Sequence, residues 1–73
     1  MASNTEARAG KIDLDEAARQ LDLAAHDIRV AASCIGLGDL DAAHISTITA
    51  RTAADAAETI LRAALGGELT STY

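Results

Sequence analysis

The chain of 73 residues carries a formal net charge of −5, and 49% of its residues are hydrophobic although its only aromatic residue is one tyrosine. A surface that binds nucleic acid needs a basic patch, so this charge argues against nucleic acid as a partner. No apolar run reaches the roughly 18 residues that a membrane span requires, so we expect no membrane partner either.

The first predicted element is a helix over residues 13–35. Residues 1–11 before it are polar and of mixed charge, and we expect them to form a disordered arm. Asp13 can cap the helix, and Glu16 stands where it would complete a capping box. Alanine is abundant and the β-branched residues do not alternate, so the composition favours helix over strand.

A turn over residues 36–39 and a second helix over 40–65 follow. Gly36 suits the left-handed conformation that often follows a helix, and Asp39 can cap the second helix. Gly66 and Gly67 would end that helix, and the tail 68–73 is expected to fray. So short a connection makes neighbouring helices antiparallel. Residues 12–67 are therefore predicted to form an all-α, antiparallel two-helix hairpin.

A seven-residue repeat of alanine predicts where the two helices meet. In a hairpin folded about Leu37, small residues stand opposite each other at three levels, and small residues let helices pack closely. The predicted pairs are Ala31 with Ala43, Ala24 with Ala50, and Ala17 with Ala57. The residues expected to close this alanine seam are Leu14, Leu21, Ile28 and Ile35 on the first helix. On the second helix Ala64 continues the alanine series, and Thr47, Ala54 and Leu61 flank it.

Further apolar residues have no place in such a seam. On the first helix Leu23, Val30 and Leu37 form a second line with a spacing of seven, and charged residues accompany it. Exposed apolar stripes often mark an interface. The residues predicted to contact a second copy or another protein are Leu23, Val30, Leu37, Arg29, Asp27, Ile45 and Ile60. Because 18 of the residues are alanine and so small a domain is marginal alone, we expect a homodimeric four-helix bundle. Scattered surface aliphatics and a hetero-complex are the alternatives.

Residues that could carry chemistry are few and scattered. His26 and His44 lie on different helices without a second ligand nearby, so we expect no metal site and solvated pairs with Asp22 and Asp41 instead. Cys34 is the only cysteine and has no basic neighbour, so we interpret it as a packing residue. No catalytic set or cofactor motif is recognisable, and we expect no enzyme and no cofactor. The first ten residues lack the apolar stretch of a signal peptide, so we expect a cytoplasmic protein.

Over residues 13–66 the pattern resembles the Rop-type helical hairpins, which dimerise into four-helix bundles with layers of small residues. That family binds RNA through a face with lysine, glutamine, asparagine and an aromatic residue. Here Lys11 is the only lysine and phenylalanine is absent, so the resemblance does not imply RNA binding. The hairpin is also similar to the small helical chaperones of type III secretion systems, and in size to phage-encoded inhibitors and acidic antitoxins.

The sequence therefore predicts a non-catalytic module, bacterial or phage-encoded, that binds a partner protein and regulates or inhibits it through helix-face contacts. The partners expected are a second copy of the chain and a protein that the sequence does not identify. The alternative is a structural or chaperone subunit of an obligate hetero-complex, resembling a secretion chaperone or an acidic antitoxin.

Overall fold

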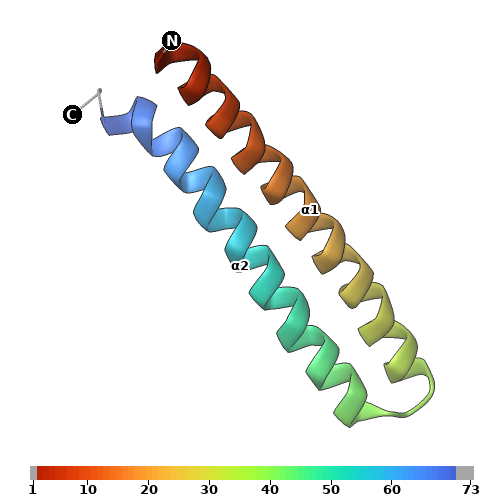
Figure 1. Cartoon of the computed structure of the whole chain (residues 1–73). Coiled ribbons are helices and arrows are strands. Elements are labelled where there is room, and N and C mark those ends of the chain that lie inside the picture. Colours follow the sequence, from red (N-terminus) through yellow and green to blue (C-terminus); the bar gives the residue numbers. More distant parts are fainter. Residues whose placement is uncertain (1, 71–73) are drawn as a thin grey trace.

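Two long helices joined by a short turn make up the protein (Figure 1). The computed structural model describes the backbone of residues 2–70 and the side chains of residues 13–66. Helix α1 comprises Ala2–Gly36 and helix α2 comprises Leu40–Thr70. They lie side by side and antiparallel, with principal-axis extents of 54 × 27 × 12 Å. The predicted all-α helical hairpin is confirmed.

Both helices extend beyond their predicted bounds. Helix α1 begins at Ala2, so Asp13 lies inside the helix and does not cap its N-terminus. Glutamate, alanine and arginine before Asp13 are good helix formers, and the single Gly10 costs only about 1 kcal/mol. Helix α2 continues through Gly66 to Thr70. The side chains of the predicted arm, and residues 71–73 of the predicted tail, lie outside the described residues.

The turn places its left-handed residue later than predicted. Gly36 is the last residue of α1, and Gly38 is the glycine with a positive φ, 79°. The N–H of Gly38 donates to the carbonyl of Ile35 (3.0 Å), and the N–H of Asp39 donates to the carbonyl of Cys34 (2.9 Å). This pair of hydrogen bonds is a Schellman motif, which satisfies carbonyls that the end of a helix leaves without partners.

Asp39 then opens the second helix, as predicted. Its Oδ1 accepts a hydrogen bond from the backbone N–H of Ala42 (3.0 Å), and its carbonyl accepts one from the N–H of Ala43 (3.0 Å). Asp41 adds negative charge to the first turn, where the helix dipole favours it. A single residue therefore completes the end of α1 and caps the start of α2.

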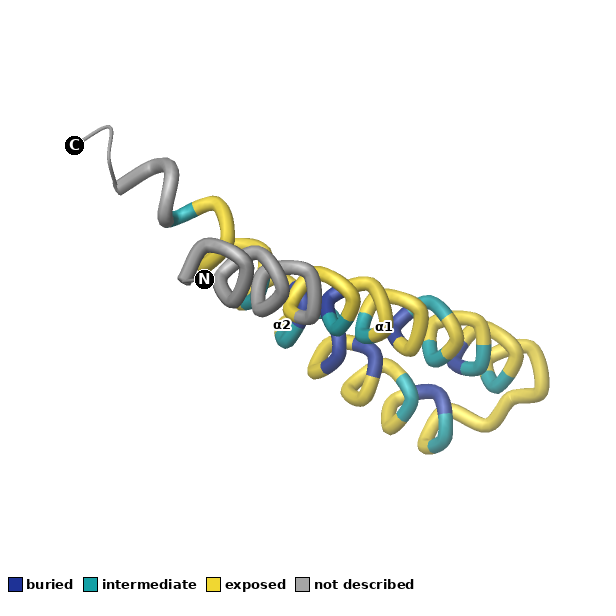
Figure 2. Tube along the Cα trace, turned by 45° about the horizontal axis from the view of Figure 1, so that its top comes forward, coloured by how far each residue is buried: buried dark blue, intermediate teal, exposed yellow. Residues whose placement is uncertain are grey.

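Among residues 13–66, only alanines are buried between the two helices. The buried residues are Ala17, Ala24, Ala31, Ala43, Ala50, Ala53 and Ala57. Figure 2 shows buried positions in both helices along the side on which they face each other. The burial of six predicted seam alanines is thus confirmed, and Ala57 is completely buried, whereas Ala64 is exposed. We call this contact the inner seam.

The large aliphatic residues predicted to close the inner seam do not do so. Leu14, Leu21, Ile28 and Ile35 are 46–61% exposed. The half-buried neighbours of the seam on α1 are instead Gln20, Asp27 and Cys34, each three residues after a buried alanine rather than four. On α2 the covered neighbours are Ser46, Ala53 and Ile60. Of the predicted flanking residues Thr47, Ala54 and Leu61, only Ala54 is half-buried. Most side chains on this covered side are short, which permits the close approach of alanine-lined helices.

Helix α2 contains four threonines whose hydroxyl groups bond back to their own helix. The hydroxyls of Thr47, Thr49, Thr52 and Thr59 each donate to the backbone carbonyl four residues earlier, over 2.8–3.1 Å. This pattern lets threonine occupy a helix without leaving its donor unsatisfied.

Candidate interaction surface

The side of α1 next to the inner seam carries an unbroken apolar surface. It combines the exposed row Leu14, Leu21, Ile28 and Ile35 with the row Ala18, Ala25 and Ala32. The two rows alternate with spacings of four and three residues, which is the pattern of a helix–helix contact. We call these seven residues the outer face of α1. Its centre lies roughly 75° around the helix from the buried alanines of the inner seam, as the helical period of 3.6 residues dictates.

The opposite flank of the inner seam is more polar. Leu23 is 42% exposed and Val30 is half-buried, so part of the predicted interface line is accessible. Glu16 stands in the same line one heptad before Leu23, and the exposed Arg19 and His26 lie beside it. The apolar character of this flank is therefore interrupted along its length.

Glu16 is the centre of a small hydrogen-bond network on that flank. It accepts hydrogen bonds from Nε and Nη2 of Arg19, at 2.9 and 2.6 Å, and from Nε2 of Gln20 at 2.8 Å. The hydrogen bonds from Arg19, and then the one from Gln20, lower the pKa of Glu16 from 4.5 to about 2. The predicted capping box is absent, because Glu16 lies in the middle of α1 and bonds forward along the helix.

The charged residues of the predicted interface lie in different places. Asp27 is half-buried beside the inner seam, with its Oδ1 3.4 Å from Nδ1 of His26, so His26 pairs with Asp27 and not with Asp22 as predicted. Arg29 is exposed and, because it lies four residues after Ala25, borders the alanine row of the outer face rather than the Leu23 line. No hydrogen bond or ion pair joins the guanidinium group of Arg29 to any of residues 13–66.

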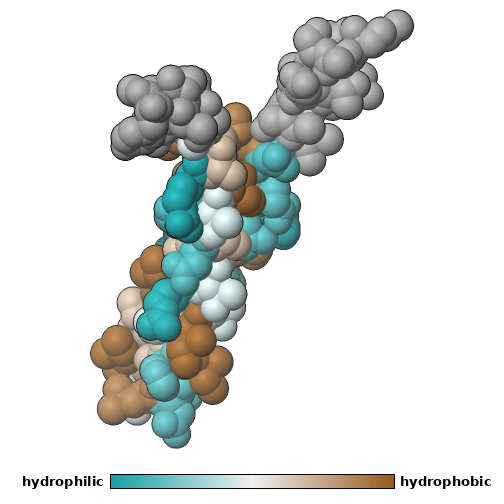
Figure 3. Space-filling model, turned by 90° about the vertical axis from the view of Figure 1, so that its left-hand side faces the viewer, coloured by the Kyte–Doolittle hydropathy of each residue, from teal (hydrophilic) through white to brown (hydrophobic). Residues whose placement is uncertain are grey.

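A second apolar feature lies at the turn. Leu37 is 85% exposed, Leu40 67% and Ile45 64%, and we call these three residues the tip cluster. Figure 3 shows apolar side chains gathered at the end of the hairpin that carries the turn. The acidic Asp39 and Asp41 stand between them in the sequence. Ile60, in contrast, is half-buried between the helices and offers little free surface.

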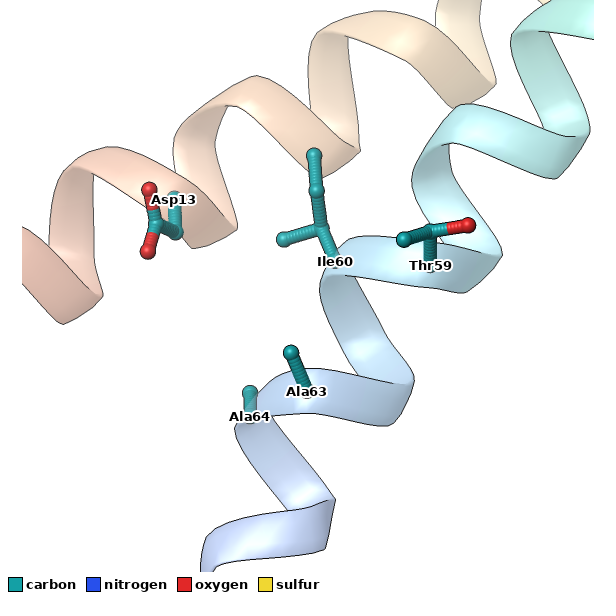
Figure 4. Close-up of a pocket in the computed structure, with 5 residues that line it drawn as sticks. All are labelled: Asp13, Thr59, Ile60, Ala63 and Ala64. Atoms are coloured by element: carbon teal, nitrogen blue, oxygen red, sulfur yellow. The ribbon is translucent and has the colours of Figure 1, made fainter.

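A hollow of about 350 Å³ lies toward the other end of the hairpin (Figure 4). Asp13 of α1 lines one side, and Ile60 points toward α1 from the other. The remaining lining residues are Thr59, Ala63 and Ala64. This volume is at the low end of the range for ligand sites. Among residues 13–66 the lining offers one carboxylate and one hydroxyl and includes no histidine, lysine or arginine.

Groups with catalytic or metal-binding chemistry are not brought together within residues 13–66. No group of three or more histidine, cysteine, aspartate or glutamate residues there could hold a metal ion. Cys34 is free and half-buried, and the two histidines are exposed on different helices. Over the residues that the structure describes, neither helix has an apolar stretch that could cross a membrane.

Comparison with protein-family models, with curated proteins and with solved structures finds no match to this chain. The function is therefore inferred from the exposed surfaces of the hairpin. The outer face of α1 is the surface that the sequence interpretation missed, because its leucine row was assigned to the inner seam. The signal that could have found it is the absence of any polar residue from its seven positions.

Proposed function

We propose that the protein is a non-catalytic helical module that acts as a homodimer in the cytoplasm and regulates or inhibits a partner protein through helix-face contacts. One observation carries this proposal. No leucine, isoleucine or valine among residues 13–66 is buried, since the core consists of alanine alone. Each large aliphatic side chain would contribute about 1.5–3 kcal/mol on full burial, so a large part of the hydrophobic free energy of residues 13–66 is available only to association.

The tip cluster is the surface that we assign to the partner protein. It combines the most exposed aliphatic side chains of the described residues with the carboxylates of Asp39 and Asp41. An amphipathic segment with basic residues complements such a surface, because the apolar side chains fill the tip and the cations meet the carboxylates. The net charge of −5 favours the approach of a basic partner.

Site-specific photo-crosslinking in cells of the native host tests this proposal. A photoreactive residue at position 37 or 45 should give a discrete adduct with another protein. The same residue in place of Asp55, which is exposed on α2 away from the tip, serves as the control. A tip that yields no adduct, or the same adducts as position 55, would contradict a partner site there.

The purified chain also distinguishes the proposal from an obligate hetero-complex subunit. A homodimeric module should be helical by circular dichroism without any other chain. A chain that is unfolded or aggregated alone, and becomes helical only with a second protein, would replace the proposal by the hetero-complex alternative.

A further inference from the structure

We propose that two copies associate through the outer face of α1, with α1 of one copy packed antiparallel against α1 of the other. This inference rests on the proposed homodimer and specifies its contact. Together with the inner seam, the contact gives α1 two neighbouring helices at about a right angle, as in a four-helix bundle.

The accessible surface of the hairpin is large enough to support such a contact. It amounts to 5657 Å² for a chain of 7.5 kDa. Compact monomers of this mass expose roughly 4,250 Å², so the surplus is roughly 1,400 Å². A stable interface of standard size buries about 800 Å² on each partner. One helix-to-helix contact between two copies therefore fits within the surplus surface.

The composition of the outer face favours it over the flank that carries Leu23. All seven positions of the outer face between Leu14 and Ile35 are leucine, isoleucine or alanine. The Leu23 flank includes Glu16, whose hydrogen bonds to Arg19 and Gln20 a partner helix would have to break or bury. Burying a charged group costs free energy unless the group keeps its hydrogen bonds, so covering the outer face costs less free energy than covering the Leu23 flank.

Helix α2 offers no matching surface on the same side of the hairpin. The corresponding positions of α2 are Thr47, Arg51, Ala54, Glu58 and Leu61. Packing α1 against α2 of the second copy would bring leucine side chains against an arginine and a glutamate. The apolar partner that the outer face of α1 requires is therefore the same face of the second copy.

Large and small residues alternate along the outer face in a way that complements its own antiparallel copy. With Ala25 placed opposite Ile28 of the second copy, Leu21 comes opposite Ala32 and Ala18 comes opposite Ile35. Since the contact is symmetric, it contains six levels, and each pairs a large side chain with an alanine. Such pairing lets layers interdigitate at close helix spacing. Shifting one copy by seven residues relative to the other preserves this pairing of large side chains with alanines.

The charges that border the outer face also select the antiparallel arrangement. Asp15, Asp22 and Arg29 follow its leucine row with a spacing of seven, and none of them forms an ion pair with any of residues 13–66. In a parallel contact these charges would face the row Ala17, Ala24 and Ala31 of the second copy, where they meet no opposite charge. The antiparallel contact described above places Arg29 beside Asp22 of the second copy, and the register shifted by one heptad places it beside Asp15. Opposite charges at these flanking positions favour one orientation over the other.

Substitution on the two flanks tests which surface associates. Analytical ultracentrifugation of the full chain should show a dimer for wild type and for the control Leu23→Glu. Leu21→Glu and Ile28→Glu should remain helical and weaken the dimer by about 100-fold or more, because each would bury an unpaired carboxylate. Dimers that survive both outer-face substitutions but dissociate with Leu23→Glu would overturn this inference and leave the proposed homodimer intact. A monomeric wild-type chain would overturn both.

Cross-linking tests the orientation without depending on a damaging substitution. In a Cys34→Ser background, Ala25→Cys places two thiols within about 6 Å along the antiparallel helices, whereas Ala32→Cys separates them by about 16 Å or more. A short thiol-to-thiol reagent should therefore couple the Ala25→Cys dimer at least ten times faster. Equal rates at both positions would indicate a parallel contact and contradict the inference.

Charge exchange tests the register. Arg29→Glu should weaken the dimer by about 5- to 10-fold, since two exposed ion pairs are lost and replaced by repulsion. Adding Asp22→Arg should restore the affinity in the register described, and adding Asp15→Arg should restore it in the register shifted by one heptad. Failure of both double variants to recover affinity would contradict the antiparallel pairing of these charges.

Discussion

The inner seam and the outer face of α1 repeat with the same period of seven residues, yet the outer face adds a row of large, exposed side chains that the seam lacks. The inner seam consists of alanines that α2 covers almost completely. The outer face carries leucines and isoleucines that remain about half exposed. A heptad repeat thus identifies a surface that contacts a helix, whereas the size of its residues indicates how closely that helix can approach.

The two surfaces also differ in the free energy that they supply. Burial of an alanine methyl group removes little apolar area from water, whereas full burial of a leucine or isoleucine contributes about 1.5–3 kcal/mol. The inner seam is therefore a close contact that contributes less hydrophobic free energy than burial of the outer face would. We expect the free energy of unfolding to depend more on association than on the inner seam.

Adjacent residues on the two surfaces provide the sharpest test of this difference, and the largest expected effect on stability. Ala24→Leu overfills the inner seam and should lower the free energy of unfolding by about 1–3 kcal/mol. Ala25→Leu enlarges the outer face, so it should weaken the dimer while the dilute monomer unfolds as wild type does. Urea unfolding at low and high protein concentration measures both effects. If both variants lowered the free energy of unfolding equally at low protein concentration, the two surfaces would not differ in this respect.

A matched pair of glycines in the turn tests what holds the inner seam in place. Gly38→Ala should cost about 1–2 kcal/mol, because its φ of 79° is unfavourable for a residue with a Cβ atom. Gly36→Ala should instead stabilise by about 0.5–1 kcal/mol, since Gly36 is helical and a Cβ atom there meets nothing within 4 Å. Thermal unfolding of the two variants compares them. If both substitutions changed the thermal stability in the same direction, the left-handed turn would not be what fixes the hairpin.

The cap of α2 should have a somewhat smaller effect. Asp39→Ala removes the acceptor for the N–H of Ala42 and should cost about 1 kcal/mol, with an unchanged oligomeric state. Asp39→Asn keeps a capping oxygen and should recover most of the loss. Chemical denaturation of the three proteins measures this. An alanine variant as stable as wild type would mean that the turn holds α2 without its cap.

The smallest expected effect concerns Glu16, on the flank that we leave free of the second copy. Its folded pKa of about 2 lies below the ordinary 4.5, so its contribution to stability is present above pH 4.5 and is lost as the pH falls toward 2. Arg19→Ala should move the carboxyl titration, followed by NMR, back toward 4.5. The exposed position of the pair makes the change in stability small. A titration unaffected by Arg19→Ala would show that the hydrogen bonds do not persist in solution.

The period of the alanines and the cap at Asp39 could be predicted from the sequence, because both follow from local rules of helix geometry. The sequence does not predict which flank of the inner seam α2 covers. Leu21 follows Ala17 by four residues and Gln20 follows it by three, so either can border the same buried alanine. The structure covers the side with Gln20, and the resulting rotation of α1 exposes the leucine row.

The end of α1 and the bounds of the candidate interface were missed for related reasons. Two glycines, Gly36 and Gly38, can each adopt the left-handed conformation, and only the hydrogen bonds of the turn select the second. The rotation of α1 also decides that Asp27 lies near the seam, whereas the position of Arg29 beside Ala25 follows from their spacing of four residues within α1. A sequence pattern gives the angle between residues on one helix, but not the direction in which the other helix lies.

The threonines of α2 have a consequence for recognition on the side of the hairpin that carries Leu23 and Ile45. Because the hydroxyls of Thr49, Thr52 and Thr59 already bond to carbonyls of their own helix, these side chains present mainly their methyl groups outward. A partner that covers them would strip few hydrogen-bonded waters from them. It would also freeze few rotamers, since a β-branched side chain held by a hydrogen bond has little conformational entropy left to lose. A surface that is polar in composition can therefore be dehydrated at low cost.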